Sequence, residues 1–290
     1  MKKSIPLLLA IAIIFISFAA VFVKWSDAPA TVISMYRMYL SSLFLLPFVY
    51  VYRKDFLNIS RKKWCFLILA GMFLALHFAL WFESLKLTSV ANSTIILTLQ
   101  PIVALIGGYF IFNERTNRTT LLTLAIAIIG IVMVSWDDFD LQQPSALLGN
   151  FLSFLSVLAV VGYLLIGQSN VRGISHWVYS FIVFFVAGAT LHVYNIIIDT
   201  PIIGYEGKEW GIFLLLAIFP TVAHVIFNYL LNYVNSSTIS MSILGEPVGA
   251  SFLAFFILNE TLSRSQLIGG FIVLIGVFLF LLQQRKSVST

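Results

Sequence analysis

The sequence predicts an all-α integral membrane protein, and its composition carries that prediction. Hydrophobic residues make up 60% of the 290 residues and charged residues only 10%, whereas soluble domains are about 45–50% apolar and about 25% charged. A globule of this length has too little interior to bury the excess, so much of it is expected to face lipid. The composition excludes a soluble enzyme, a nucleic-acid-binding protein and a disordered chain. The single cysteine, Cys65, excludes an internal disulfide and a cysteine-based zinc site.

Ten apolar stretches are each long enough to cross a bilayer, because a crossing helix needs about 20 mostly apolar residues. The loops between them are short, and the longest two, 52–63 and 198–209, follow the second and the seventh stretch. In chain order the predicted spans are 4–23, 31–51, 64–84, 88–112, 119–136, 147–167, 174–197, 210–231, 235–258 and 266–284.

The basic residues predict the orientation of these spans. With the N-terminus inside, twelve Lys and Arg residues fall on the cytoplasmic side and four on the other, while Arg37 lies within the second span. Cytoplasmic loops carry such an excess of Lys and Arg in membrane proteins. We therefore expect a multi-pass protein of the cell membrane (a plasma or bacterial inner membrane) with both termini in the cytoplasm. The net charge of +5 is then explained by the Lys and Arg residues of the cytoplasmic loops and does not indicate nucleic-acid binding.

An internal repeat appears when the chain is compared with itself at a shift of 146 residues. Eleven identities fall between positions 101 and 130, among them Pro101 with Pro247, Asn113-Glu114 with Asn259-Glu260, and Gly130 with Gly276. The predicted halves are 1–146 and 147–290. Each half holds five spans, an odd number, so the second half is inverted relative to the first. Inverted repeats are typical of secondary transporters, whose substrate site lies near the bilayer midplane between the repeats.

The same segments resemble the drug/metabolite transporter superfamily, and in particular its ten-helix EamA-type members. The resemblance rests on Gly245-Glu246-Pro247, on Asn259-Glu260 a dozen residues later, and on the glycine-rich last span. Gln100-Pro101 begins the first copy of this motif, so the first half has an amide where the second half has a carboxylate. The resemblance implies a substrate cavity between helices 1–4 and 6–9, with helices 5 and 10 bracing the halves.

Polar residues inside the predicted spans are the candidate site, because ionisable groups at membrane depth are costly. Arg37 is either a fork that binds a carboxylate or phosphate, or one partner of a structural pair. His77 and Trp81 share one face of the third span, as His224 and Asn228 do in the eighth. The expected substrate-binding residues are Tyr36, Arg37, His77, Trp81, Gln100, His224 and Asn228.

Coupling and gating are expected at Glu246, Pro247 and Pro101. Pro247 lacks an N–H and should kink the ninth span. A protonatable Glu246 beside that hinge is either a proton-coupling group or a hydrogen-bonded packing residue, and the sequence leaves both interpretations open.

We therefore expect a secondary transporter, with export of amino acids or related zwitterions favoured, and not an enzyme. The alternatives are a carrier of drugs, organic phosphates or nucleotide-type metabolites and, with less support, an intramembrane enzyme. No cofactor is expected. The expected partners are a small-molecule substrate and the lipid bilayer, without nucleic acid. One chain can form a complete cavity, so a monomer suffices and a dimer is compatible.

The topology gives the first prediction. A reporter enzyme fused after Asp138, in the loop between the two halves, should read as non-cytoplasmic, whereas a fusion at the C-terminus should read as cytoplasmic. The positive-inside distribution is the physical reason. A cytoplasmic signal from the Asp138 fusion would contradict the predicted orientation.

Overall fold

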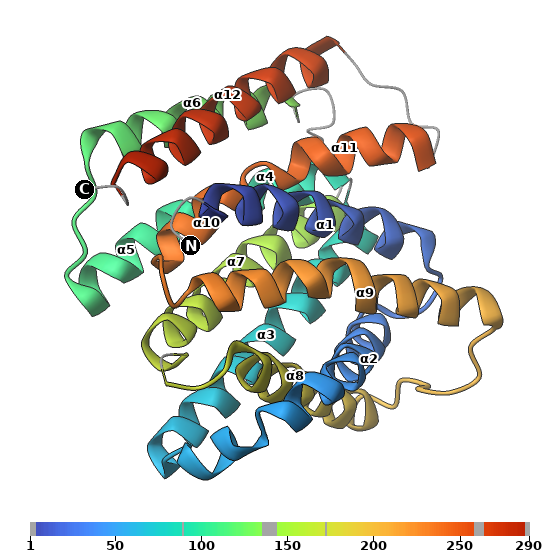
Figure 1. Cartoon of the computed structure of the whole chain (residues 1–290). Helices are drawn as coiled ribbons and strands as arrows, with labels where there is room; N and C mark the ends of the chain where they lie inside the picture. The colour runs from blue at the N-terminus through green and yellow to red at the C-terminus, as the bar shows by residue number, and fades with distance from the viewer. Residues whose placement is uncertain (1–3, 89, 135–143, 172, 258–263, 288–290) are drawn as a thin grey trace.

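A computed structural model describes residues 4–88, 90–134, 144–171, 173–257 and 264–287, and within these ranges the regular elements are all helical (Figure 1). The first half contains α1 (Ile5–Trp25), α2 (Ala30–Val51), the 3₁₀ helix η2 (Arg53–Asn58), α3 (Arg61–Leu87), α4 (Val90–Leu97), α5 (Gln100–Phe112) and α6 (Arg118–Val134). The second half contains α7 (Pro144–Asn170), α8 (His176–Ile197), α9 (Gly207–Leu230), α10 (Ser236–Ile243), α11 (Glu246–Ile257) and α12 (Arg264–Ser287).

The helices agree with the ten predicted spans. Within the described ranges, seven segments are long and apolar enough to cross a membrane, with α10 and α11 together forming one of them. Shorter apolar helices lie within α5, α6 and α12. The protein is therefore an all-α membrane protein with two repeated halves, as the sequence predicts.

The fourth and ninth spans are interrupted, which the sequence analysis predicted only as a kink in the ninth. In the first half α4 ends at Leu97 and α5 begins at Gln100, with Pro101 in its first turn. In the second half α10 ends at Ile243 and α11 begins at Glu246, followed by Pro247. A proline fits the first turn of a helix, where its missing N–H has no partner to lose, but it cannot continue a preceding helix. Both breaks therefore occur at the same position of the repeat.

The two halves interlock around a pseudo-two-fold relation (Figure 1). α3 of the first half packs along α7 of the second, and the pair related to it by the repeat, α9 of the second half and α1 of the first, also packs together. α2 packs on its own counterpart α8, and α6 on its counterpart α12. The halves of the interrupted spans also meet across the repeat, since α10 contacts α5 and α11 contacts α4. Each half thus lacks a separate core, and the central helices are buried only when both halves are present.

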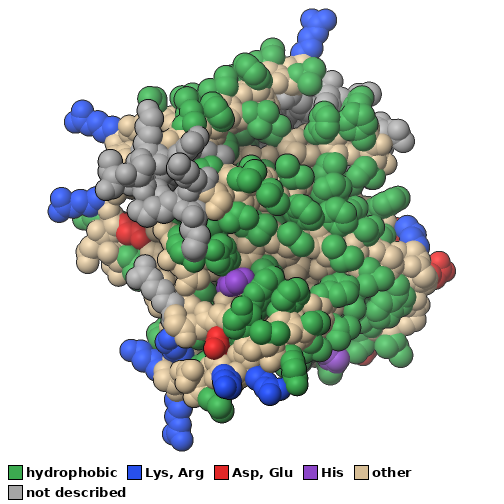
Figure 2. Space-filling model, viewed as in Figure 1, with side chains coloured by type: hydrophobic (Ala, Val, Ile, Leu, Met, Phe, Trp, Pro, Cys, Tyr) green, Lys and Arg blue, Asp and Glu red, His purple; other side chains and the backbone are tan. Residues whose placement is uncertain are grey.

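The surface fits a lipid environment. Figure 2 shows hydrophobic side chains across the middle of the molecule, while Lys and Arg lie mainly toward the left and lower edges of the view. Large apolar side chains such as Phe110 (76% exposed) and Phe271 (66% exposed) point outward. In water such a surface would be an aggregation hazard, whereas in a bilayer it faces acyl chains.

Glycine allows α6 and α12 to approach closely. A Cβ atom at Gly130 would lie 2.6 Å from both the Gly269 carbonyl oxygen and the Val273 amide nitrogen. At Gly276 a Cβ would lie 2.9 Å from the Ala127 amide nitrogen. These neighbours are backbone atoms that cannot rotate away, so the pair requires glycine at its crossing.

We expect Gly130→Ala to destabilise the protein by about 1–3 kcal/mol, the usual cost of overpacking. The measurement is the midpoint of thermal unfolding in detergent. Gly211→Ala, on α9, is the matched control, because a Cβ there has nothing within 4 Å. Equal midpoints for the two variants would contradict the close crossing of α6 and α12.

Candidate functional site

A small enclosed cavity lies between the two halves and brings together most of the predicted site residues. The lining residues come from α1 to α5, α7 and α9 to α11. They are Ile16, Ala19, Arg37, His77, Phe78, Trp81, Leu97, Gln100, Val160, His224, Ile243 and Glu246. Its volume of about 20 Å³ is room for about one water molecule. The protein is therefore described in a closed conformation, and a metabolite-sized substrate requires the helices to separate.

Arg37 is the cation of this cavity. Its side chain is fully buried, and its three guanidinium nitrogens have no hydrogen-bond partner among the described residues. The guanidinium carbon lies 3.9 Å from the centre of the Phe78 ring and 5.7 Å from that of Phe82. Aromatic faces attract a cation without occupying its N–H donors. The fork is consequently held in place and still free to bind an anionic group.

Glu246 is the carboxyl group of the same cavity. It is 3% exposed, and its Oε1 atom has no hydrogen-bond partner within the described part of the chain. Its counterpart in the repeat, Gln100, also lines the cavity and donates from Nε2 to Ser240 Oγ at 3.1 Å. The amide is therefore anchored to α10 while the carboxylate is not. At this cavity position the first half of the repeat therefore has an amide and the second half a carboxyl group.

His77, Trp81 and His224 supply the remaining polar edges of the cavity. The rings of His77 and Trp81 are nearly parallel, with centres 5.8 Å apart, and His77 Nδ1 lies 3.0 Å from the Ser156 carbonyl oxygen. Trp81 Nε1 and His224 Nδ1 are buried without a hydrogen-bond partner among the described atoms. Buried polar atoms are rarely left unpaired, and here Trp81, His224 and Arg37 place several such atoms around one cavity.

Two of the predicted binding residues lie outside the cavity lining. Tyr36 is half-buried, donates from its hydroxyl to the Ile202 carbonyl oxygen at 2.5 Å, and packs on Trp210 and Phe213. It points away from Arg37, because adjacent residues on a helix do not share a face. Asn228 is fully buried behind the cavity.

Asn228 forms a structural network. Its Oδ1 atom accepts from the Tyr163 hydroxyl, and its Nδ2 atom donates to Ser180 Oγ at 3.0 Å. Both hydrogen bonds join α9 to neighbouring helices. His224 and Asn228 were both predicted to bind substrate from one face of the eighth span. In the structure His224 lines the cavity, whereas Asn228 is part of the helix packing around it.

Sequence reasoning missed Phe78 and Tyr163. Phe78 follows His77 directly in an apolar span. The sequence of such a span does not distinguish a phenylalanine that contacts a guanidinium group from one that faces lipid. Tyr163 could be noticed only as a polar hydroxyl deep in the sixth span. Pro101 and Pro247 are both buried at the helix breaks beside the cavity, where they were expected to act.

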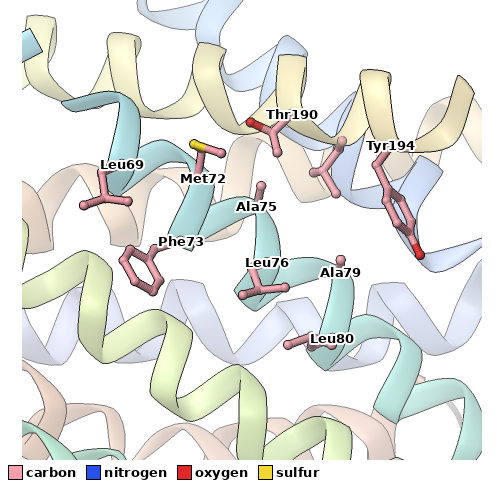
Figure 3. Close-up of a pocket in the computed structure, with 10 residues that line it drawn as sticks. Leu69, Met72, Phe73, Ala75, Leu76, Ala79, Leu80, Thr190 and Tyr194 are labelled. Atoms are coloured by element: carbon pink, nitrogen blue, oxygen red, sulfur yellow. The ribbon is translucent and has the colours of Figure 1, made fainter. Parts of the chain in front are cut away.

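A larger groove lies elsewhere, between α3 and α8 (Figure 3). It has a volume of about 370 Å³, and Thr190 and Tyr194 are its polar residues. Figure 3 shows the other labelled side chains, such as Leu76 and Met72, extending from α3 into the same groove. Leu76 and Met72 are each 48% exposed on the outer surface of the bundle. This groove lacks the charged groups of the central cavity and faces the acyl-chain region.

We expect Asn228→Leu to lower stability, because it leaves the Tyr163 and Ser180 hydroxyls without their partner. Interhelical hydrogen bonds in membranes contribute about 0.6 kcal/mol on average and at most about 1.7 kcal/mol. The measurement is the unfolding midpoint in detergent. Asn232→Leu is the matched control, since Asn232 bonds only within its own helix end. An unchanged midpoint for Asn228→Leu would contradict the network.

Known proteins resemble this chain over its whole length. The EamA-like transporter family matches residues 3–136 and again 147–282. An "Uncharacterized transporter" of Archaeoglobus fulgidus is 26% identical over 90% of both chains. The "S-adenosylmethionine uptake transporter" of Rickettsia bellii is 26% identical over 89% of this chain and 85% of its own. A solved crystal structure superposes with a TM-score of 0.81 at 16% identity over 99% of both chains, which shows the shared fold.

The twofold family match coincides with the two interlocked halves, and the relatives are named as transporters. This chain therefore belongs to the EamA-like transporter family and is a membrane transporter, not an enzyme.

Proposed function

We propose that this transporter carries a small zwitterionic metabolite, an amino acid or a derivative of one, by alternating access. The observation that carries the proposal is that one cavity is lined by two buried ionisable side chains, Arg37 and Glu246, whose guanidinium nitrogens and Oε1 atom have no hydrogen-bond partner among the described residues. The carboxylate of an amino acid would take the guanidinium fork, and its ammonium group would take the free oxygen of Glu246.

The energetic argument is that both charges need a partner. An ionised side chain at the bilayer centre costs about 2.5–3.5 kcal/mol on insertion scales. Arg37 and Glu246 interact through space, but they do not saturate one another's hydrogen bonds. A zwitterion offsets both costs at once, whereas a simple anion or cation offsets only one. Binding of the complete ligand is thus favoured over binding of its fragments.

The alternatives fit less well. An organic phosphate or nucleotide would need more than one cation, and Arg37 is the only Lys or Arg residue in the lining set. A hydrophobic drug would leave Arg37, Glu246 and His224 unpaired. The unpaired nitrogen atoms of Trp81 and His224 suit an amino-acid substrate whose own side chain carries hydrogen-bonding groups.

The relatives add one candidate to the substrate set. The Rickettsia proteins named as S-adenosylmethionine uptake transporters point to a ligand that contains an α-amino and an α-carboxylate group beside a purine and a sulfonium. This chain keeps complementary charges for the amino-acid part. Export remains our proposed direction, and the name of those relatives makes uptake the alternative outcome of a transport assay.

Glu246 is our proposed coupling residue. It begins α11 directly after the break in the ninth span, so a change in its charge acts where the backbone can hinge. A carboxyl group that releases its proton when the substrate's ammonium group binds, and takes a proton up when that group leaves, would link transport to a proton gradient.

The deciding experiment is counterflow in proteoliposomes with a labelled panel of amino acids, S-adenosylmethionine, a sugar phosphate and a cationic drug, each with and without a pH gradient. Saturable exchange of amino-acid-type ligands supports the proposal. Exchange of the sugar phosphate or the drug alone would overturn the zwitterion site.

We expect Arg37→Lys to weaken substrate binding about 10- to 100-fold, since a point charge replaces a bidentate fork and charged hydrogen bonds contribute about 1.5–3 kcal/mol. Glu246→Gln should abolish the dependence on the pH gradient. The matched controls are Arg118→Lys and Glu206→Gln, which change exposed residues away from the cavity. Wild-type affinity in Arg37→Lys would rule out the bidentate site, and retained gradient dependence in Glu246→Gln would rule out its coupling role.

A further inference from the structure

Glu114, from the Asn113-Glu114 pair of the repeat, has its side chain turned inward between helices of the two halves. The chain ends α5 at Asn113 in the left-handed conformation (φ 55°), and the Glu114 amide bonds back to the Gly108 carbonyl at 3.1 Å. This tight turn brings the carboxylate back over α5. A Cβ atom at Gly108 would lie 2.7 Å from Glu114 Oε2, so glycine leaves the space that the carboxylate occupies.

The Glu114 carboxylate joins both halves of the protein. Its Oε1 atom accepts from Gln168 Nε2 at 2.6 Å, and its Oε2 atom accepts from Asn235 Nδ2 at 2.9 Å. Gln168 Oε1 in turn accepts the amide of Ser236, the first residue of α10, at 2.5 Å. Because Asn235 precedes Ser236, these contacts form a closed ring that fastens α5, the end of α7 and the start of α10.

The ring lies at one end of a direct route to the cavity. α10 packs along α5 and covers about 12 Å with its eight residues. At the ring end, Ser237 lies beside Gly108. Ser240, in the middle of α10, accepts from Gln100, and Ile243, at the other end of α10, lines the cavity together with Gln100. All eight residues of α10 are buried. A separation of α10 from α5 would break the contacts of the ring.

The opposite end of the molecule is closed by different residues. Glu209, in the first turn of α9, accepts from the Ser26 hydroxyl through Oε2 and from the Asp27 amide through Oε1 at 3.0 Å. Lys86 Nζ donates to the Ser26 carbonyl at 2.5 Å. A carboxylate of the second half thus ties down the α1–α2 loop of the first. Both ends are closed by carboxylates that cross between halves, as a fully closed state of an alternating-access transporter requires.

We infer that Glu114, Gln168 and Asn235 are gating residues, which hold the cavity shut at the Glu114 end while Glu209 holds it shut at the other. The inference needs only transport by alternating access and holds for any substrate. It assigns a role in the conformational change to Glu114, which the sequence analysis identified only as part of the internal repeat.

The test is the accessibility of a buried reporter near the ring. In a Cys65→Ser background, which removes the exposed native thiol, Ser237→Cys places a thiol on α10. Ser237 is 4% exposed and its hydroxyl has no partner among the described atoms, so the replacement costs little. Protein in lipid nanodiscs is exposed at both faces, and the labelling rate with a polar methanethiosulfonate reagent therefore requires no knowledge of orientation.

We expect Glu114→Gln to raise the labelling rate of Ser237→Cys about tenfold or more, because it removes charge-assisted hydrogen bonds that only the closed state forms. The matched control is Glu209→Gln, which should leave this rate unchanged. A second reporter, Ser34→Cys, lies one turn from Arg37 toward the Glu209 end and is fully buried. It should respond to Glu209→Gln and not to Glu114→Gln.

Two outcomes would overturn the inference. One is a labelling rate of Ser237→Cys that Glu114→Gln leaves unchanged, and the other is an equal rise with Glu209→Gln, which indicates general loosening. If Glu114→Gln does not fold, Gln168→Leu breaks the same ring without changing charge and gives the same expected result. Labelling needs no substrate, so a negative result in the counterflow panel and a negative result here are distinguishable.

Discussion

The whole structure depends on the lack of water in the hydrocarbon core, where every polar group must find its partner inside the protein. Helices meet this demand for the backbone, which is why the spans are helical. The two breaks, at Pro101 and Pro247, are tolerated because they lie within the protein, where Leu99 and Gly245 satisfy their amides through tight turns. The unpaired atoms of Arg37 and Glu246 are exceptions to the same demand. They lie in one cavity together with the unpaired Trp81 Nε1 and His224 Nδ1 atoms, so unpaired polar atoms from four helices face the same space.

The helix count, the repeat and the membrane location could be predicted from sequence because each follows from hydrophobicity summed over about 20 residues. The helix breaks were harder to predict. A proline in the sequence is compatible with a kinked helix and with two separate helices. Which of the two forms depends on how the neighbouring helices pack around the proline. The site shows a similar division. Arg37, His77, Trp81, Gln100, His224 and Glu246 could be identified because polar residues in spans are rare, and the fold brings all six to one cavity.

Tyr36, Asn228 and Phe78 show why the rest of the site could not be predicted. Tyr36 adjoins Arg37 in sequence but is rotated by about 100° on the helix, and only the packing of α2 decides which of the two faces the cavity. Asn228 lies on the same helix face as His224, yet its side-chain amide is hydrogen-bonded to the hydroxyls of Tyr163 and Ser180 on two other helices. Phe78 acts through a contact of 3.9 Å with a cation on another helix. The roles of all three residues depend on tertiary contacts, which the periodicity of polar residues along a helix does not reveal.

The repeat explains why the two ends close alike with different residues. At the end that carries Glu114, Asp55 before α3 accepts the backbone amide of Ser175 in the α7–α8 loop at 2.7 Å. At the other end, Glu209 at the start of α9 accepts the amide of Asp27 in the α1–α2 loop. α3 and α9 occupy equivalent places in the two halves, as do the two loops. Each end therefore has a carboxylate that holds an interhelix loop, although Asp55 and Glu209 are not aligned in the repeat. Because different residues hold the two ends, each end can open at its own energetic cost.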